Sequence, residues 1–151
     1  MNKKLLILFF FLLNCGYKPV YQNVDIQNLQ FEEVILNGNK EINRKIINSL
    51  SIDDNKNINN GKKLYITSSH KIEITSKNSQ GQAISFRTNI IVDLKIENEE
   101  NNESKNRNFN KELAYNNKEN KFLLVEYQNS IKKELVNQII GEIIIYLNTQ
   151  W

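Results

Sequence analysis

The sequence predicts an α+β fold: a two-layer sandwich in which about four mostly antiparallel strands are covered on one face by two helices. Long segments in the middle of the chain alternate apolar and polar residues, which is the period of a half-buried strand. Two other segments repeat apolar residues with the period of a helix that buries one side. Each element therefore has one apolar face, and these faces can be buried only against one another. The length of 151 residues suits one domain.

The first part of the fold is expected to hold a strand, a short helix and a loop. Asn39 has a side chain that caps helix N-termini. After it, apolar residues recur at helical spacing up to Leu50. Gly and Asn mark a turn before the cap, and a polar stretch follows the helix. The expected positions are a strand at about 24–36, a turn at Asn37-Gly38, a helix at 40–50 and a loop at 51–61.

The next three elements are expected to be strands joined by short polar turns, which favours an antiparallel meander. In the clearest strand, every second residue from Leu64 to Ile74 lies on one face, and polar or charged residues occupy most of the other. At ~3.3 Å per residue the two longest strands approach 50 Å, so an elongated domain is expected. The three strands are expected at residues 62–76, 82–97 and 105–116.

The chain is expected to end in a long helix over about residues 122–147. Apolar residues recur at helical spacing from Leu124 to Leu147 and form a wide stripe. The C-terminal half is apolar nearly all round, which predicts burial on more than one side. This stripe either covers the sheet alone or, around residues 143–146 and Trp151, also contacts a partner.

The first fourteen residues have the layout of a secretory signal. A basic segment with Lys3 and Lys4 precedes nine apolar residues at 5–13. Nine helical residues rise only ~14 Å, about half of a ~30 Å hydrocarbon core, so this segment is too short for a permanent span. The apolar run ends at Asn14, directly before a cysteine.

Cys15 is the one cysteine of the chain, so no disulfide can form within it. Leu12-Leu13-Asn14-Cys15 resembles a lipobox, the site where a diacylglyceryl group is attached to the thiol before cleavage. The pattern departs at the residue before the cysteine, where Gly, Ala or Ser is usual. An ordinary cleaved signal and an uncleaved anchor are the alternatives. The sequence thus predicts a lipoprotein signal peptide at 1–14, a tether lipidated on Cys15 at 15–23 and a folded domain at 24–151.

The composition argues against several classes of function. The 20 Lys and Arg residues include Lys3 and Lys4, so the chain without its leader has 18 basic and 17 acidic residues, a net charge of +1. Nucleic-acid binding needs a strongly basic surface and is not expected. With one His, one Cys and no Gly-rich phosphate loop, neither a metal site nor a nucleophile pair is expected. We therefore expect no enzyme, no metal and no cofactor besides the covalent lipid.

The single histidine and two acidic pairs are interpreted structurally. His70 falls on the apolar face of its strand and is interpreted as a core or edge residue, not as a catalytic one. The adjacent carboxylates at 53–54 and 99–100 lie in polar stretches and are interpreted as solvated turn residues.

Four basic residues lie on the polar faces of the two long strands. Arg and Lys are the side chains that bind phosphate, so Arg87 is the first candidate for a phosphate ligand and Lys71 the second. Glu73 and Asp93 are interspersed with them, and a solvated face of mixed charge is the alternative. The four basic residues are Lys63, Lys71, Arg87 and Lys95.

The segment Cys15-Gly16-Tyr17-Lys18-Pro19-Val20-Tyr21 resembles the opening of mature LPS-assembly lipoproteins of the LptE family, alphaproteobacterial type. The likeness continues in the short helix that ends at Leu50 and in the Gly81-Gln82-Ala83 turn before the strand with Arg87. A final helix closes the chain in both. The composition departs, because Asn and Ile replace much that would otherwise be Ala, Leu or Arg.

The resemblance implies a non-enzymatic lipoprotein on the periplasmic side of the cell outer membrane. Such proteins plug, and assist the assembly of, the β-barrel translocon that inserts lipopolysaccharide, so the implied partner is an LptD-like barrel. Lipopolysaccharide itself is an implied contact, with its phosphates as the groups that Arg87 and Lys71 would bind. The alternatives are a lipid-binding or auxiliary lipoprotein of an ABC-type lipid transport system without a barrel partner, and a structural lipoprotein without a ligand.

Overall fold

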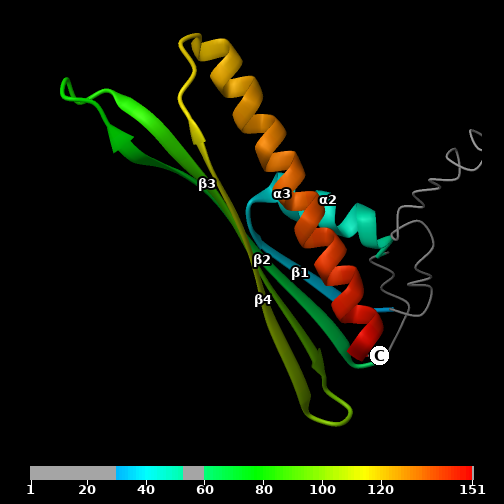
Figure 1. Cartoon of the computed structure of the whole chain (residues 1–151). Helices are drawn as coiled ribbons and strands as arrows, with labels where there is room; N and C mark the ends of the chain where they lie inside the picture. The colour runs from blue at the N-terminus through cyan, green and yellow to red at the C-terminus, as the bar shows by residue number, and fades with distance from the viewer. Residues whose placement is uncertain (1–29, 53–59, 151) are drawn as a thin grey trace, which may run out of the picture.

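The computed structural model describes residues 30–52 and 60–150. Four strands form one sheet in the order β1-β2-β3-β4, and two helices pack on one of its faces (Figure 1). The predicted α+β fold is confirmed. The elements are β1 (Glu33–Gly38), α2 (Lys40–Leu50), β2 (Lys62–Lys77), β3 (Ala83–Asn98), β4 (Glu103–Asn116) and α3 (Lys121–Gln150).

The sheet is mixed. β2, β3 and β4 form the predicted antiparallel meander. β1 runs parallel to β2, because α2 carries the chain from the end of β1 back to the edge where β2 begins. β1 pairs only with the segment of β2 from Lys63 to Ser68, so the remainder of β2 lies at the edge of the sheet in the described part of the chain.

β1 differs from the strand that the sequence predicts at 24–36. The structure places it at Glu33–Gly38, and residues 24–29 lie outside the described residues. Asn37 and Gly38, predicted as a turn, belong to the strand because they pair with Thr67 and Ser68 of β2. The change of direction comes at Gly38, whose φ of 85° glycine adopts without strain.

The core lies between the sheet and the helices. α2 packs on β1 and β2, and α3 packs on β3 and β4 (Figure 1). The strand residues that the alternation places on the apolar face point toward the helices, and burying a side chain of this kind stabilises the fold by about 1.5–3 kcal/mol. The largest fully buried side chains are Phe31, Ile42, Ile46, Leu50, Leu64, Ile66, Ile90, Leu94, Ile96, Ile139, Ile143 and Leu147.

The two halves of α3 differ in burial. Its C-terminal half buries one row at Ile139, Ile143 and Leu147 and a second row at Val136 and Ile140, as the sequence predicts, whereas Ile145 is 53% exposed. Its N-terminal half instead leaves several large apolar side chains exposed. None of the described helices is long and apolar enough to cross a membrane.

A buried polar junction joins β1, α2 and β2. The Asn39 side chain accepts a hydrogen bond from the Ile42 backbone N–H at 3.1 Å, which confirms the predicted helix cap. The Asn43 amide donates to the Asn37 carbonyl at 2.7 Å, and its oxygen accepts from the Ser68 hydroxyl at 2.6 Å. These bonds satisfy polar groups that would otherwise be costly to bury.

Gly38 lies directly against this junction, where a Cβ atom would come within 2.0 Å of the Ser68 carbonyl oxygen. We expect Gly38→Ala to lower the free energy of unfolding, measured by urea denaturation, by more than about 3 kcal/mol. Gly81→Ala is the matched control, because Gly81 also has a positive φ but nothing within 4 Å. The control is expected to lose only about 1 kcal/mol. Equal losses of stability at the two positions would show that the close approach of residue 38 to Ser68 adds nothing to the loss.

Candidate functional site

The sheet face that points away from the helices carries the basic residues predicted as phosphate ligands. In the antiparallel register Glu73 lies opposite Arg87, and Lys71 lies opposite Asn89. Residues at these positions share one face, so Arg87 and Lys71 are diagonal neighbours on adjacent strands. The predicted pairing of the two strands is thus confirmed, and the structure brings both candidate residues together on this outer face.

Both candidate residues have a carboxylate beside them. The Lys71 Nζ lies 2.5 Å from Glu73, and an Arg87 guanidinium nitrogen lies 3.7 Å from Glu112 of β4. The hydrogen bond from Lys71 lowers the pKa of the Glu73 carboxyl. A phosphate bound here would have to compete with carboxylates for both cations, in a solvent-exposed setting where each pair is weak.

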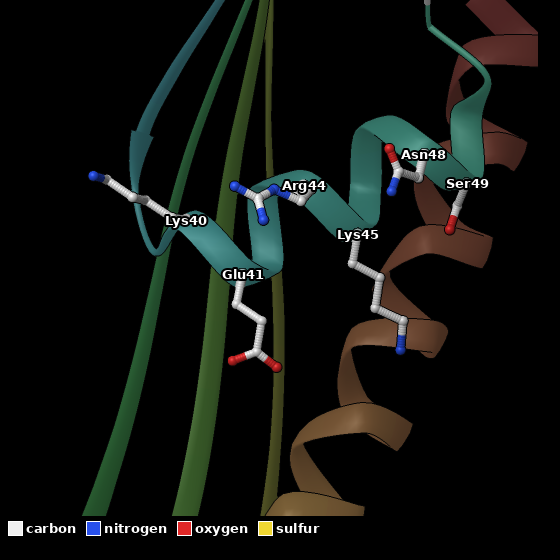
Figure 2. Close-up of a pocket in the computed structure, with 6 residues that line it drawn as sticks. All are labelled: Lys40, Glu41, Arg44, Lys45, Asn48 and Ser49. Carbon is white, nitrogen blue, oxygen red and sulfur yellow. The ribbon is translucent and has the colours of Figure 1, made fainter.

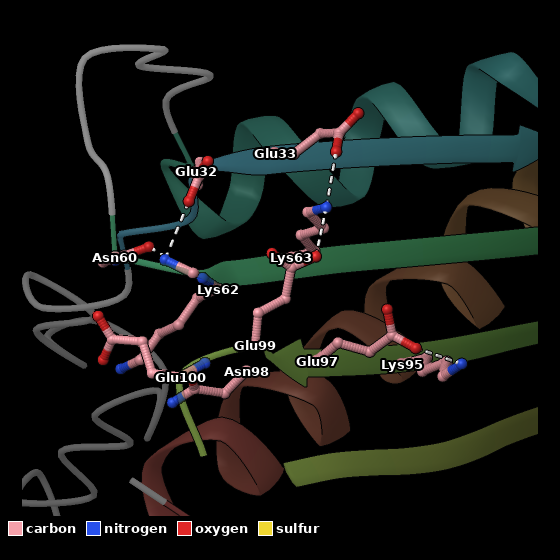
Figure 3. A network of polar contacts seen from close by, with 11 residues as sticks. Glu32, Glu33, Asn60, Lys62, Lys63, Lys95, Glu97, Asn98, Glu99 and Glu100 are labelled. Atoms are coloured by element: carbon pink, nitrogen blue, oxygen red, sulfur yellow. Dashed lines mark hydrogen bonds and ion pairs between the residues drawn. The ribbon is translucent and has the colours of Figure 1, made fainter. Parts of the chain in front are cut away.

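Lysines of the outer face are also paired with glutamates where β2 begins and β3 ends (Figure 3). Lys63 lies 3.8 Å from Glu33 and 2.6 Å from Glu99, and Lys95 lies 2.6 Å from Glu97. The hydrogen bond to Glu99 raises the pKa of Lys63, and the bond to Glu97 raises that of Lys95. All four basic residues singled out on this face therefore have an acidic neighbour.

His70 lies on the helix-facing side of the sheet, half-buried, in agreement with its interpretation as a residue at the margin of the core. Burial lowers the pKa of its imidazole, and Lys132 of α3 lowers it further. The ring is therefore mostly neutral at pH 7. Its Nε2 atom has no hydrogen-bond partner among the described residues. That part of the chain also contains no group of three or more His, Cys, Asp or Glu residues that could hold a metal ion.

The outer side of α2 carries a basic surface that the strand pattern does not indicate. Six residues of this helix line an open hollow of about 550 Å³ (Figure 2). Residues four apart on a helix are neighbours on its surface, so Lys40 lies beside Arg44, and Arg44 lies beside Asn48. The six lining residues, here called the α2 basic surface, are Lys40, Glu41, Arg44, Lys45, Asn48 and Ser49.

The cations of the α2 basic surface are not neutralised by the acid among them. The Glu41 carboxylate accepts a hydrogen bond from the Lys132 Nζ at 2.7 Å, and this bond lowers the pKa of Glu41. The Lys45 Nζ lies 3.5 Å from the backbone oxygen of Lys133. Within residues 30–52 and 60–150, Lys40 and Arg44 form no ion pair. This surface therefore presents cationic donors to an incoming anion.

Cys15 and the boundaries of the predicted signal peptide and tether lie outside the described residues. Lipidation at this position stays a prediction. The same holds for Trp151 and for the acidic pair at 53–54, whereas residues 99–100 lie in the turn between β3 and β4, as predicted.

Comparison with known proteins gives structural matches only. No protein-family model matches the sequence, and no curated protein matches it. The solved structure of rare lipoprotein B from Shewanella oneidensis matches with a TM-score of 0.60 and 13% identity, over 78% of this chain and 94% of that chain. An uncharacterized lipoprotein B from Nitrosomonas europaea matches with a TM-score of 0.54 and 14% identity, over 85% and 88% of the two chains.

At these identities the likeness is one of fold. It covers most of this chain and nearly all of the solved structures. The alphaproteobacterial type stays a prediction. The fold that the resemblance implies is confirmed, because the chain has the LptE-like fold of rare lipoprotein B.

Proposed function

We propose that this chain is a non-enzymatic lipoprotein of the cell outer membrane that plugs, and assists the assembly of, the β-barrel that inserts lipopolysaccharide. The observation that carries the proposal is the LptE-like fold, which spans 78% of the chain in the match to rare lipoprotein B. The proposed partner is an LptD-like barrel. Lipopolysaccharide is the proposed ligand, with Arg87 and Lys71 as candidates for its phosphates.

The shape of the described part suits a plug. β2 and β3 have 16 residues each, which corresponds to roughly 50 Å at ~3.3 Å per residue. The sheet has only four strands, so the domain is long and narrow. Its outer face carries exposed and mutually paired charges, as a surface facing the polar interior of a barrel requires.

The proposed anchor is a lipid on Cys15, at the start of the mature chain after removal of the signal peptide at residues 1–14. Each buried methylene contributes roughly 0.8 kcal/mol, and stable anchoring takes two acyl chains. The tether at 15–23 would then hold the domain on the periplasmic side of the membrane.

A second candidate function is supported by the α2 basic surface. Lys40 and Arg44, which form no ion pair within the described residues, suit a lipoprotein that binds lipid headgroups directly, as a part of an ABC-type lipid transport system without a barrel. The two candidates differ in the partner that they require.

Cys15→Ala is expected to abolish labelling of the chain by a clickable fatty acid in growing cells, because the thiol is the acyl acceptor. In-gel fluorescence after the click reaction measures the labelling, and an immunoblot measures the amount of chain. Asn14→Gly, which restores a usual residue before the cysteine, is the control and should keep the label. Label that persists in Cys15→Ala would place the anchor elsewhere.

Purification of the tagged chain after detergent extraction is expected to recover a large β-barrel protein in about equal amounts, identified by mass spectrometry. A second tagged lipoprotein of similar abundance serves as the control. Recovery of inner-membrane ATPase components instead would favour the second candidate function. A chain that purifies alone would contradict both candidates.

Arg87→Glu is expected to weaken lipopolysaccharide binding about tenfold, the effect of losing one hydrogen bond to a charged group. Lys105→Glu on β4 changes the net charge equally and is expected to have a smaller effect. Binding to immobilised lipopolysaccharide measures both variants. Equal losses would point to a general effect of charge and would remove Arg87 as a ligand.

A further inference from the structure

The α2 basic surface differs from the outer face of the sheet in the state of its cations. On the sheet, Lys71 and Arg87 each lie beside a carboxylate. On α2, the carboxylate of Glu41 is bound by Lys132 from the neighbouring helix. Lys40 and Arg44 form no ion pair within the described residues, and Lys45, which donates to a backbone oxygen, adds a third positive charge within less than two turns of helix. The net charge of the whole chain is only +3.

The donors of this surface suit a phosphate group. The side chains of Lys40 and Arg44 extend in the same direction from the helix (Figure 2). A guanidinium binds phosphate through two parallel hydrogen bonds, and an ammonium adds a compact charge. The amide of Asn48 and the hydroxyl of Ser49 line the same hollow and provide neutral donors. Phosphate is the anion whose charge and several acceptor oxygens match such a set.

A surface of α3 that extends from Lys133 about 12 to 16 Å along the helix, to Val125 and Phe122, indicates what the phosphate is attached to. Phe122 is 75% exposed and Val125 is 54% exposed, and both line an open hollow that also includes Lys133. Lys133 adjoins the α2 basic surface, because its backbone oxygen accepts a hydrogen bond from Lys45. Exposed aromatic and aliphatic side chains next to lysines are typical of protein surfaces that bind at the boundary between lipid headgroups and acyl chains.

We propose that Lys40, Arg44 and Lys45 bind the phosphate group of an anionic lipid headgroup, while Phe122 and Val125 contact its hydrocarbon. The site lies on the helical layer, on the opposite side of the domain from Arg87 and Lys71. It rests on the second candidate function, for which it names the binding residues and the ligand, and it does not depend on a barrel partner. Within the described residues Lys40 and Arg44 form no ion pair that a phosphate would have to displace, so the site binds phosphate more tightly than the outer face of the sheet does.

The test is a titration of the full chain, purified in dodecyl maltoside, with dodecyl phosphate and separately with inorganic phosphate. Lys40→Glu/Arg44→Glu is expected to weaken dodecyl phosphate binding by at least about tenfold. Glutamate at position 40 lies in the first turn, where it favours a helix, and circular dichroism checks that α2 stays folded with both substitutions. The control variant Lys77→Glu/Lys105→Glu changes the net charge equally, away from α2, and is expected to bind within about twofold of the parent.

Phe122→Ser separates the two sources of phosphate. It is expected to weaken dodecyl phosphate binding about threefold or more, through the loss of buried apolar area, and to leave inorganic phosphate binding unchanged. Inorganic phosphate that binds as tightly as dodecyl phosphate would overturn the assignment to a lipid.

Two further outcomes would overturn the site itself. Equal losses in Lys40→Glu/Arg44→Glu and in the control variant would reduce the effect to net charge. A larger loss in Lys71→Glu/Arg87→Glu would place the stronger site on the sheet. Recovery of a barrel with the tagged Lys40→Glu/Arg44→Glu chain is a separate readout, and it is expected to be unchanged. Failure of that recovery in the parent chain bears only on the proposed function.

Discussion

The position of α2 is the constraint on which the rest of the structure depends. Because β1 and β2 are parallel, the chain has to cross back over the sheet between them, and α2 makes this crossing from the junction at Gly38. The crossing turns Ile42, Ile46 and Leu50 into the core. The opposite side of the helix then faces outward with its cations.

The same placement distributes the charge of a nearly neutral domain unevenly. Packing α2 against α3 brings Glu41 to Lys132 and so pairs the acid that lies three and four positions before Arg44 and Lys45 with a cation of the other helix. On the sheet the register has the opposite effect, because it places Glu112 beside Arg87. The cations on the outer face of the sheet are thus paired with carboxylates, which suits a long contact with a polar surface. The α2 basic surface instead presents its cations to anions.

The sequence predicts the elements whose signals are local. The helix at Lys40–Leu50 has the expected bounds, because the capping residue and the apolar residues that predict it are close together in the sequence. The predicted end of the first strand is two residues too early, because this end depends on pairing with Ser68, thirty residues further along the chain. The same holds for the candidate sites: alternation places Arg87 on the outer face, whereas the α2 basic surface depends on the Glu41–Lys132 pair, which joins residues 91 apart and has no local signal.

A mismatch of lengths explains why this fold suits a protein with a binding partner. α2 has 11 residues and spans about 16 Å, whereas β2 has 16 residues at about 3.3 Å each. α3 has 30 residues and continues along β3 and β4, but only α2 packs on β2. The helices therefore leave the hairpin end of β2 uncovered, and Ile74 and Ile84 stay 50% and 46% exposed near this hairpin. Apolar surface left in water costs roughly 25 cal/mol per Å². A partner or a lipid that covers this end of the sheet removes that cost, and the proposed role supplies both.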